Sequence, residues 1–195
     1  MELLFLSIGL IAVLGDFFIP LILGKKYPKY SSLKDTISTL GTKKSPVKKQ
    51  LAYWLIILGI LLLTFSIGHM FVFLIYTWKE ILYILGIIIF GVGCILSGIF
   101  EEIPKGSEET LSGKIHGISS GLGFLFLIFN SLWMFFIAEN IELKIFNICC
   151  FILGFLTFII FLVSNKRDGL TGLWQRINLA TIYLPLILNY IILTF

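Results

Sequence analysis

The stretch from Leu51 to Thr77, LAYWLIILGILLLTFSIGHMFVFLIYT, decides the fold, because it contains no lysine, arginine, aspartate or glutamate. An α-helix needs about 20 apolar residues to cross the hydrocarbon core of a bilayer, which is about 30 Å thick. In lipid, only helices and closed barrels satisfy their backbone groups, and barrel strands alternate apolar and polar residues. This stretch does not alternate, so it predicts a membrane-spanning helix.

Comparable apolar blocks lie on both sides of this stretch. Of the 195 residues, 58% are hydrophobic and 13% are charged, whereas about a quarter of the residues in a soluble domain are charged. We therefore predict an all-α integral membrane bundle of six transmembrane helices, forming a single membrane domain over residues 1–195. The helices are expected at about residues 3–23, 51–77, 81–100, 114–138, 143–164 and 172–194.

Basic residues are distributed unevenly between the two sides of the predicted membrane. The loops after the first, third and fifth helices and their flanks hold thirteen of them, including Lys105 and Arg167, and the opposite side holds Lys79 and Lys144. Since cytoplasmic loops carry an excess of lysine and arginine, we expect a multi-pass protein of the cell membrane with both termini outside. The lysine-rich first loop dominates this count, so a folded external segment there would invert the orientation.

Among the polar residues within the predicted spans, we single out Asp16 in the first and Asn130 in the fourth. Charged groups are costly in lipid and are therefore candidates for function. Asp16 must face the bundle interior, a partner or water. Both a ligand or proton site and a structural hydrogen bond to a neighbouring helix are open interpretations.

A second group of polar residues lies at the predicted cytoplasmic boundary. Glu101 ends the third helix, His116 and Ser120 share a face of the fourth, Arg176 opens the sixth, and Ser38 lies in the first loop. A hydroxyl, an imidazole and a carboxylate can act together as a nucleophile, its base and the group that orients the base. Arginine binds anionic headgroups. These five residues are the candidate ligand-binding site. Helix-end ion pairs that stabilise the bundle are the competing interpretation, and no residue is assigned a catalytic role.

Small residues predict which helices pack closely, because lipid provides no hydrophobic force between helices. Gly86 and Gly93 share a face of the third helix, and Gly117 and Gly121 form a GxxxG pair in the fourth. We expect these two helices to form a tight hairpin, with a homo-oligomer as a further option. Aromatic residues near helix ends predict anchors at the membrane interface: Trp54, Trp78, Trp133 and Trp174.

Three segments, by their order and spacing, are similar to those of a known family. They are ISTLG at 37–41 with a following proline, GVG at 91–93 with GIF at 98–100 and HGI at 116–118, and GLWQR at 172–176. The chain resembles, over almost its whole length, the uncharacterised prokaryotic membrane family known as domain of unknown function 998. Many members have a proline and then an acidic residue after the phenylalanine, whereas here Glu101-Glu102-Ile103-Pro104 follows. The resemblance implies a six-helix fold and no established activity.

The first segment also resembles, more distantly, the damage-regulated autophagy modulator family of six-helix proteins. In that family this loop is thought to lie on the non-cytoplasmic side, opposite to the side that the basic residues predict.

Three functions remain open. The first is binding of a lipid or amphiphile between the helices near the cytoplasmic face. The second is an intramembrane hydrolase or transferase acting on a lipid through His116, Glu101 and Ser38, and the third is a small-solute transporter that uses Asp16. We expect membrane lipids as partners, no cofactor and no metal, since there is no HExxH or phosphate-binding loop. Nucleic acid is not expected, because the basic segment is short and lies beside lipid.

Overall fold

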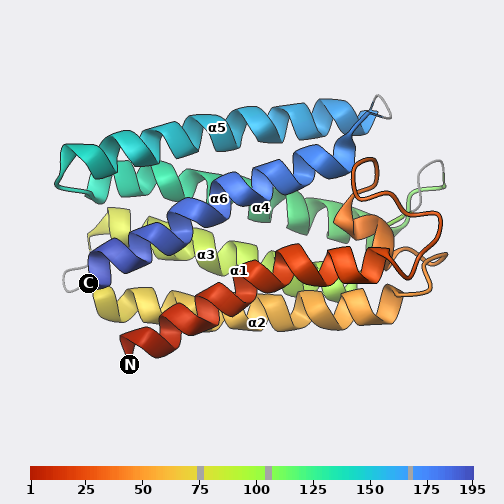
Figure 1. The fold of residues 1–195 in the computed structure, drawn as a ribbon, viewed down its shortest axis with the longest axis horizontal. Coiled ribbons are helices and arrows are strands. Elements are labelled where there is room, and N and C mark those ends of the chain that lie inside the picture. The colour runs from red at the N-terminus through yellow and green to blue at the C-terminus, as the bar shows by residue number, and fades with distance from the viewer. Residues whose placement is uncertain (74–76, 104–106, 167–168) are drawn as a thin grey trace.

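Six long α-helices form one bundle in the computed structural model of the protein, and helices adjacent in sequence run antiparallel (Figure 1). The structure describes residues 1–73, 77–103, 107–166 and 169–195, and it contains no β-strand within them. Each helix is long and apolar enough to cross a membrane, which confirms the predicted fold of a multi-pass membrane protein. The helices are α1 (Glu2–Gly24), α2 (Lys48–Val72), α3 (Trp78–Ile99), α4 (Leu111–Ile137), α5 (Ile141–Lys166) and α6 (Thr171–Thr194).

The largest difference from the predicted helix bounds is at the junction of α2 and α3. Helix α2 ends at Val72, five residues before the predicted end at Thr77, and residues 74–76 of that prediction lie outside the described part. Thr77 caps α3: its side chain accepts from the start of the helix, and its backbone N–H donates to the Glu80 carboxylate. This capping box starts α3 at Trp78, three residues before the predicted start at residue 81. The basic residues at positions 105 and 167 also lie outside the described residues.

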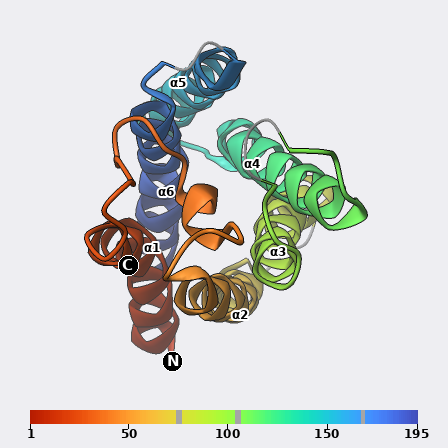
Figure 2. The ribbon, with the colours of Figure 1, turned by 90° about the vertical axis from the view of Figure 1, so that its right-hand side faces the viewer.

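The helices are arranged around the bundle in their sequence order. Helix α3 packs between α2 and α4, α5 packs between α4 and α6, and α1 packs against α2 and α6. A short 3-10 helix, η1 (Ile37–Gly41), lies within this ring where α1, α3 and α5 end (Figure 2). We call this side the loop end, and both termini lie at the opposite end (Figure 1).

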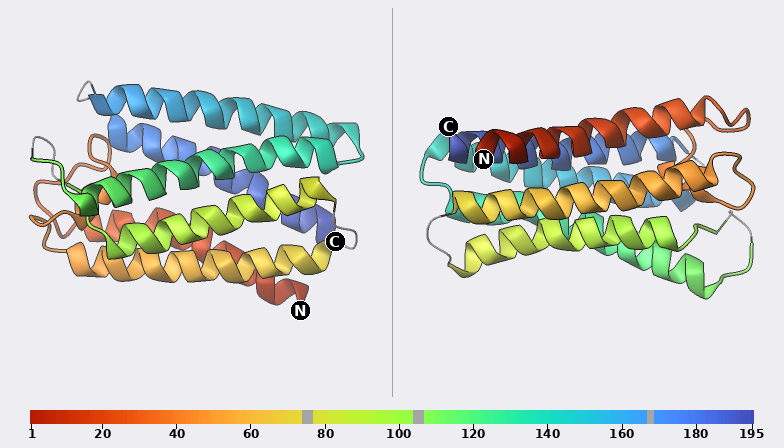
Figure 3. Two further views of the ribbon diagram at one scale, coloured as in Figure 1. Left: turned by 180° about the vertical axis from the view of Figure 1, so that it is seen from behind. Right: turned by 90° about the horizontal axis from the view of Figure 1, so that it is seen from below.

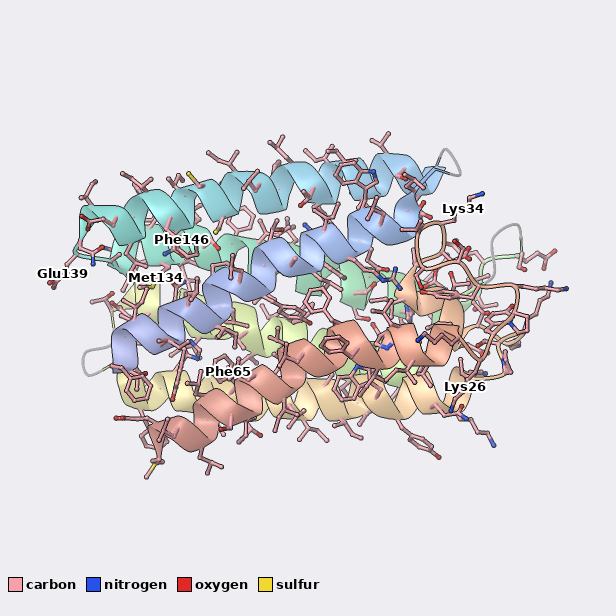
Figure 4. All side chains as sticks on the ribbon, viewed as in Figure 1. Lys26, Lys34, Phe65, Met134, Glu139 and Phe146 are labelled. Carbon is pink, nitrogen blue, oxygen red and sulfur yellow. The ribbon has the colours of Figure 1, made fainter. Side chains whose placement is uncertain are left out.

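Charged side chains lie at the two ends of the bundle, and apolar side chains lie between them. Lys26 and Lys34 lie at the loop end and Glu139 at the other end, while Phe65, Met134 and Phe146 lie between them (Figure 4). Charges thus flank a long apolar belt, as expected for a protein that spans a bilayer.

Close contacts between helices depend on glycines that have no room for a side chain. A Cβ atom on Gly59 of α2 would overlap the carbonyl oxygen of Gly91 on α3. One on Gly93 of α3 would lie 2.7 Å from the carbonyl oxygen of Ser119 on α4. The predicted α3–α4 hairpin is confirmed. The GxxxG interpretation is wrong for the interior of the bundle, because a Cβ atom at Gly117 or Gly121 would meet open space.

Amide side chains join helices inside the membrane. Asn130 of α4 donates from Nδ2 to the carbonyl oxygen of Tyr83 on α3 over 2.9 Å. Asn147 of α5 and Asn189 of α6 donate to each other at 3.0 and 2.9 Å. Asn178 of α6 donates to the carbonyl oxygen of Gly154 on α5 at 2.7 Å. None of these three α5–α6 asparagines was predicted from the sequence. Asn147 and Asn189 satisfy each other across the interface, whereas Asn178 donates to a backbone carbonyl.

Candidate functional site

Helix α4 lies beside α5 at the end of the bundle that carries both termini, and it diverges from α5 toward the loop end (Figure 3). In this half of the bundle there is a cavity with about 480 Å³ of space between atoms, part of it open to the outside. We call it the inner chamber. Its walls come from α1, η1, α2, α3, α4 and α6: Asp16, Ile37, Ser38, Leu55, Leu58, Phe90, Gly93, Cys94, Ser97, Ser119, Ser120, Gly123, Phe124, Gln175 and Leu179.

Asp16 lies in the wall of the inner chamber and is 4% exposed. The indole N–H of Trp54 on α2 donates to Asp16 Oδ1 at 3.2 Å, and the hydroxyl of Tyr183 on α6 donates to Oδ2 at 2.9 Å. The carboxylate therefore joins three helices. The prediction that Trp54 anchors the protein at the membrane interface is wrong, because its ring is 6% exposed and packs across Gly15 of α1.

The 3-10 helix η1 closes part of the chamber at the loop end. Thr36 caps it by accepting from the backbone N–H of Thr39, and Leu40 is completely buried. The backbone N–H of Ile37 donates to Gln175 Oε1 of α6 at 2.7 Å, which fixes η1 against α6. Ser38, one residue further, consequently lines the inner chamber.

Arg176 attaches the first loop to the bundle rather than lining the chamber. Its guanidinium donates to the carbonyl oxygen of Ser32 at 2.7 Å and to the hydroxyl of Tyr30 at 2.7 Å. Burial raises the pKa of Tyr30, so its hydroxyl stays neutral and accepts from the guanidinium. The backbone N–H of Leu173 donates to the carbonyl oxygen of Leu33 at 2.9 Å. The first turn of α6 therefore holds the loop that carries η1.

A second cavity, the outer chamber, adjoins the inner chamber through two shared wall residues, Leu55 and Ser97. It has about 580 Å³ of space between atoms, again including its open part. Its walls are formed by Gly41, Lys48, Leu51, Ala52, Leu55, Ser97, Gly98, Ile99, Glu101, Glu102, Ser112 and His116.

Charged groups in the outer chamber are paired with one another. Lys48 donates to Glu101, and Lys43 Nζ lies 3.6 Å from the other carboxylate oxygen of Glu101. The hydrogen bond from Lys48 holds the pKa of Glu101 below its ordinary value. His116 Nε2 lies 2.9 Å from Glu102 Oε2. Glu101 and His116 thus share a chamber, but His116 pairs with the neighbouring Glu102.

The structure therefore divides the five boundary candidates into three groups. Ser38 and Ser120 line the inner chamber together with Asp16, and Glu101 and His116 line the outer chamber. Arg176 binds the first loop, and Asn130 lies between α3 and α4.

Two residues of the site were not predicted from the sequence. Gln175 holds η1, and Ser97 lies in the wall that both chambers share. The Ser97 hydroxyl oxygen is buried and has no hydrogen-bond partner among the described residues. Buried polar groups normally have partners, so an orphaned hydroxyl beside two cavities indicates a group that a ligand or water would satisfy. A serine in an apolar helix has no distinctive local signal, so only its neighbours identify it.

The model of a family described as "Protein of unknown function (DUF998)" matches residues 10–190. The chain belongs to this family. No curated protein and no solved structure is significantly similar to the chain. The three family-like segments come together at the site: residues 37–41 and 172–176 meet at the hydrogen bond from Ile37 to Gln175, and Gly93 and His116 line the two chambers.

His116 has a contact at each of its two ring nitrogens. His116 Nδ1 lies 2.9 Å from the carbonyl oxygen of Phe100, and its Nε2 faces Glu102. Both ring nitrogens thus have neighbours other than a hydroxyl, whereas a general base needs a nucleophile within hydrogen-bond reach. Within the described residues, no group of three or more histidine, cysteine or acidic side chains is arranged to hold a metal.

Proposed function

We propose that the protein binds a membrane lipid or another amphiphile in the inner chamber, with the polar end of the ligand among the serines and its chain directed toward the membrane. A concave site with mostly apolar walls and a few polar groups is typical of small-molecule binding. The observation that carries the proposal is the unpartnered Ser97 hydroxyl in the wall of such a cavity.

The surface of α4 next to the chamber supports a path for the chain of the ligand. Phe124 lines the chamber and its ring lies 6.3 Å from that of Phe158 on α5. From there toward the loop end, α4 diverges from α5 (Figure 3), and Gly117 and Gly121 have open space beside them. A hydrocarbon chain lying along these glycines would remain in an apolar environment while its polar end entered between the helices.

A phenylalanine in the chamber wall is expected to displace the ligand. Ser120 is only partly exposed and lines the chamber, and its hydroxyl bonds within its own helix at 3.2 Å, so Ser120→Phe fills the space without removing a contact between helices. We expect at least tenfold less co-purifying ligand, measured by native mass spectrometry with lipid identification. The matched control is Ser7→Phe, since the Ser7 hydroxyl also bonds within its own helix but faces outward.

A second variant tests the polar end of the ligand. Ser97→Ala removes a hydroxyl that has no partner among the described residues, so the unfolding temperature should be unchanged while ligand affinity falls by up to about tenfold. The same lipid mixture on wild type, Ser120→Phe and Ser97→Ala would contradict the proposal.

We also infer that the loop end lies in the cytoplasm of a cell whose plasma membrane holds the protein, with both termini outside. The first loop carries lysines that extend from this end, including Lys26 and Lys34 (Figure 4). Each lysine near a membrane surface would attract anionic headgroups by about 1 kcal/mol.

Reporter fusions test this orientation. Alkaline phosphatase needs disulfides that form only outside the cytoplasm, so a fusion after Phe195 is expected to be active and a fusion after Lys34 inactive. The opposite pattern would show that the basic loop is external. The matched fusion after Glu139, at the same end as Phe195, should be active as well.

The other two functions receive less support. A hydrolase or transferase would need a hydroxyl beside His116, whose nitrogens face Phe100 and Glu102. A transporter that uses Asp16 would need this side chain to exchange partners, yet Trp54 and Tyr183 both bond to it.

A further inference from the structure

The wall of the inner chamber contains an acidic side chain but no basic one among the described residues. Of the described residues in its wall, Asp16 is the one with a carboxyl group, and the other polar groups are serines, a glutamine and a thiol. No lysine, arginine or histidine is present in that wall. Two basic groups outside this wall have other partners, because Arg176 binds the first loop and Lys48 pairs with Glu101 in the outer chamber.

The contacts of Asp16 favour its ionised form. An indole N–H can only donate a hydrogen bond, and the Trp54 N–H and the Tyr183 hydroxyl each donate to a different carboxylate oxygen. Arg176 is near enough to act on Asp16 electrostatically, but it forms no ion pair with it. A carboxylate within the membrane span that has neutral donors and no cationic partner among the described residues remains costly. A cation that reached it would relieve this cost.

Aromatic rings add to this preference. Phe90 and Phe124 line the chamber. The ring of Phe90 lies 5.7 Å from that of Phe124 and 5.9 Å from that of Tyr183, which holds the carboxylate. Ring faces attract ammonium groups, most strongly where water is excluded. The same rings and the carboxylate would repel a phosphate or a carboxylate ligand.

We propose that the polar end of the ligand is an ammonium group on an apolar chain, which binds at Asp16 in the inner chamber beside Phe90 and Phe124. This inference rests on the proposed function and narrows it to one class of amphiphile. An aminophospholipid headgroup and a free lipophilic amine both present this chemistry.

Three probes that share one chain length test the inference: decylamine, which is cationic, decanol, which is neutral, and decanoate, which is anionic. Binding to the full chain in the uncharged detergent dodecyl maltoside is measured by calorimetry. We expect wild type to bind decylamine at least about tenfold more tightly than decanol, and decanoate most weakly. Equal or tighter binding of decanol or decanoate to wild type would overturn the inference without any variant.

The variant Asp16→Asn removes the charge and keeps the shape and an acceptor for Tyr183. It should bind decylamine and decanol about equally. A decylamine preference that persists in Asp16→Asn would exclude Asp16 as the partner and overturn the inference. Native mass spectrometry distinguishes an aminophospholipid headgroup from a free amine. Retention of phosphatidylethanolamine over phosphatidylglycerol by wild type alone indicates a headgroup. A decylamine preference without retention of phosphatidylethanolamine indicates a free amine.

Different results would contradict the proposed ligand binding in the inner chamber and the inferred preference for an ammonium group. If decanol binds wild type and Ser120→Phe abolishes this binding, the chamber is a ligand site whatever the preference among the probes. If no probe binds and Ser120→Phe retains the same lipids as wild type, the proposed function itself is contradicted.

Discussion

Replacing Gly59 with alanine is expected to destabilise the bundle strongly by forcing α2 and α3 apart. The added methyl group would overlap the Gly91 carbonyl oxygen and lie 2.5 Å from Cγ1 of Ile95, so α2 and α3 would have to separate. Backbone atoms cannot move aside as a flexible side chain can, and forced overpacking costs about 1–3 kcal/mol or more. We expect a loss of about 3 kcal/mol in the free energy of unfolding, measured by thermal unfolding in detergent and by the yield of monodisperse protein.

The chain contains its own control for this prediction. Gly121→Ala places the same methyl group on α4 where it would meet open space. Alanine is about 1 kcal/mol better than glycine in a helix, so this variant should be as stable as wild type or slightly more stable. If both variants unfold alike, the close approach of α2 and α3 is not what stabilises the bundle.

Replacing Arg176 with alanine is expected to release the first loop while the helices stay assembled. The change removes the charged hydrogen bonds to Ser32 and Tyr30. Such bonds contribute about 1.5–3 kcal/mol each, so the loss of both should make the loop open at least about 100-fold more often. Trypsin, which cleaves after lysine, should then cut at Lys29 and Lys34 faster by a similar factor, as measured by mass spectrometry of the fragments.

Two controls separate loop release from general unfolding. Arg176→Lys keeps the charge but not the forked donor geometry, and we expect an intermediate cleavage rate. Lys144 lies in α5, outside the first loop, and its cleavage rate should be unchanged. Faster cleavage at Lys144 as well would show that Arg176 supports the whole bundle instead of the loop.

The number and approximate positions of the helices could be predicted because a membrane span is a local property. A run of about 20 apolar residues spans the bilayer whatever its neighbours are, and each predicted range overlaps an observed helix. Helix ends were less predictable. Hydropathy does not distinguish Val72 from the residues after it. The end of α2 is instead marked by the capping box that Thr77 and Glu80 form at the start of α3.

The candidate site was only partly predictable for a related reason. Asp16 was identified because a charge in an apolar run is conspicuous, and its contact with helices α2 and α6 is one of the two interpretations left open. Ser97 and Gln175 were not predicted as site residues, since an uncharged polar residue in a span gives no comparable signal. The GxxxG pair wrongly predicted close helix packing, because the spacing of the glycines alone does not say which helix, if any, lies against them.

What the sequence by itself determined is that this chain crosses a membrane six times, with lysines concentrated at one end and a carboxylate inside the apolar belt. What only the tertiary structure decided is the rotation of each helix about its axis. In water, the apolar face of a helix turns inward. In lipid every face is apolar, so small residues and hydrogen bonds choose the interface. That choice brings Asp16, Ser38, Ser97 and Gln175 to one chamber and turns Gly117 and Gly121 away from the bundle interior.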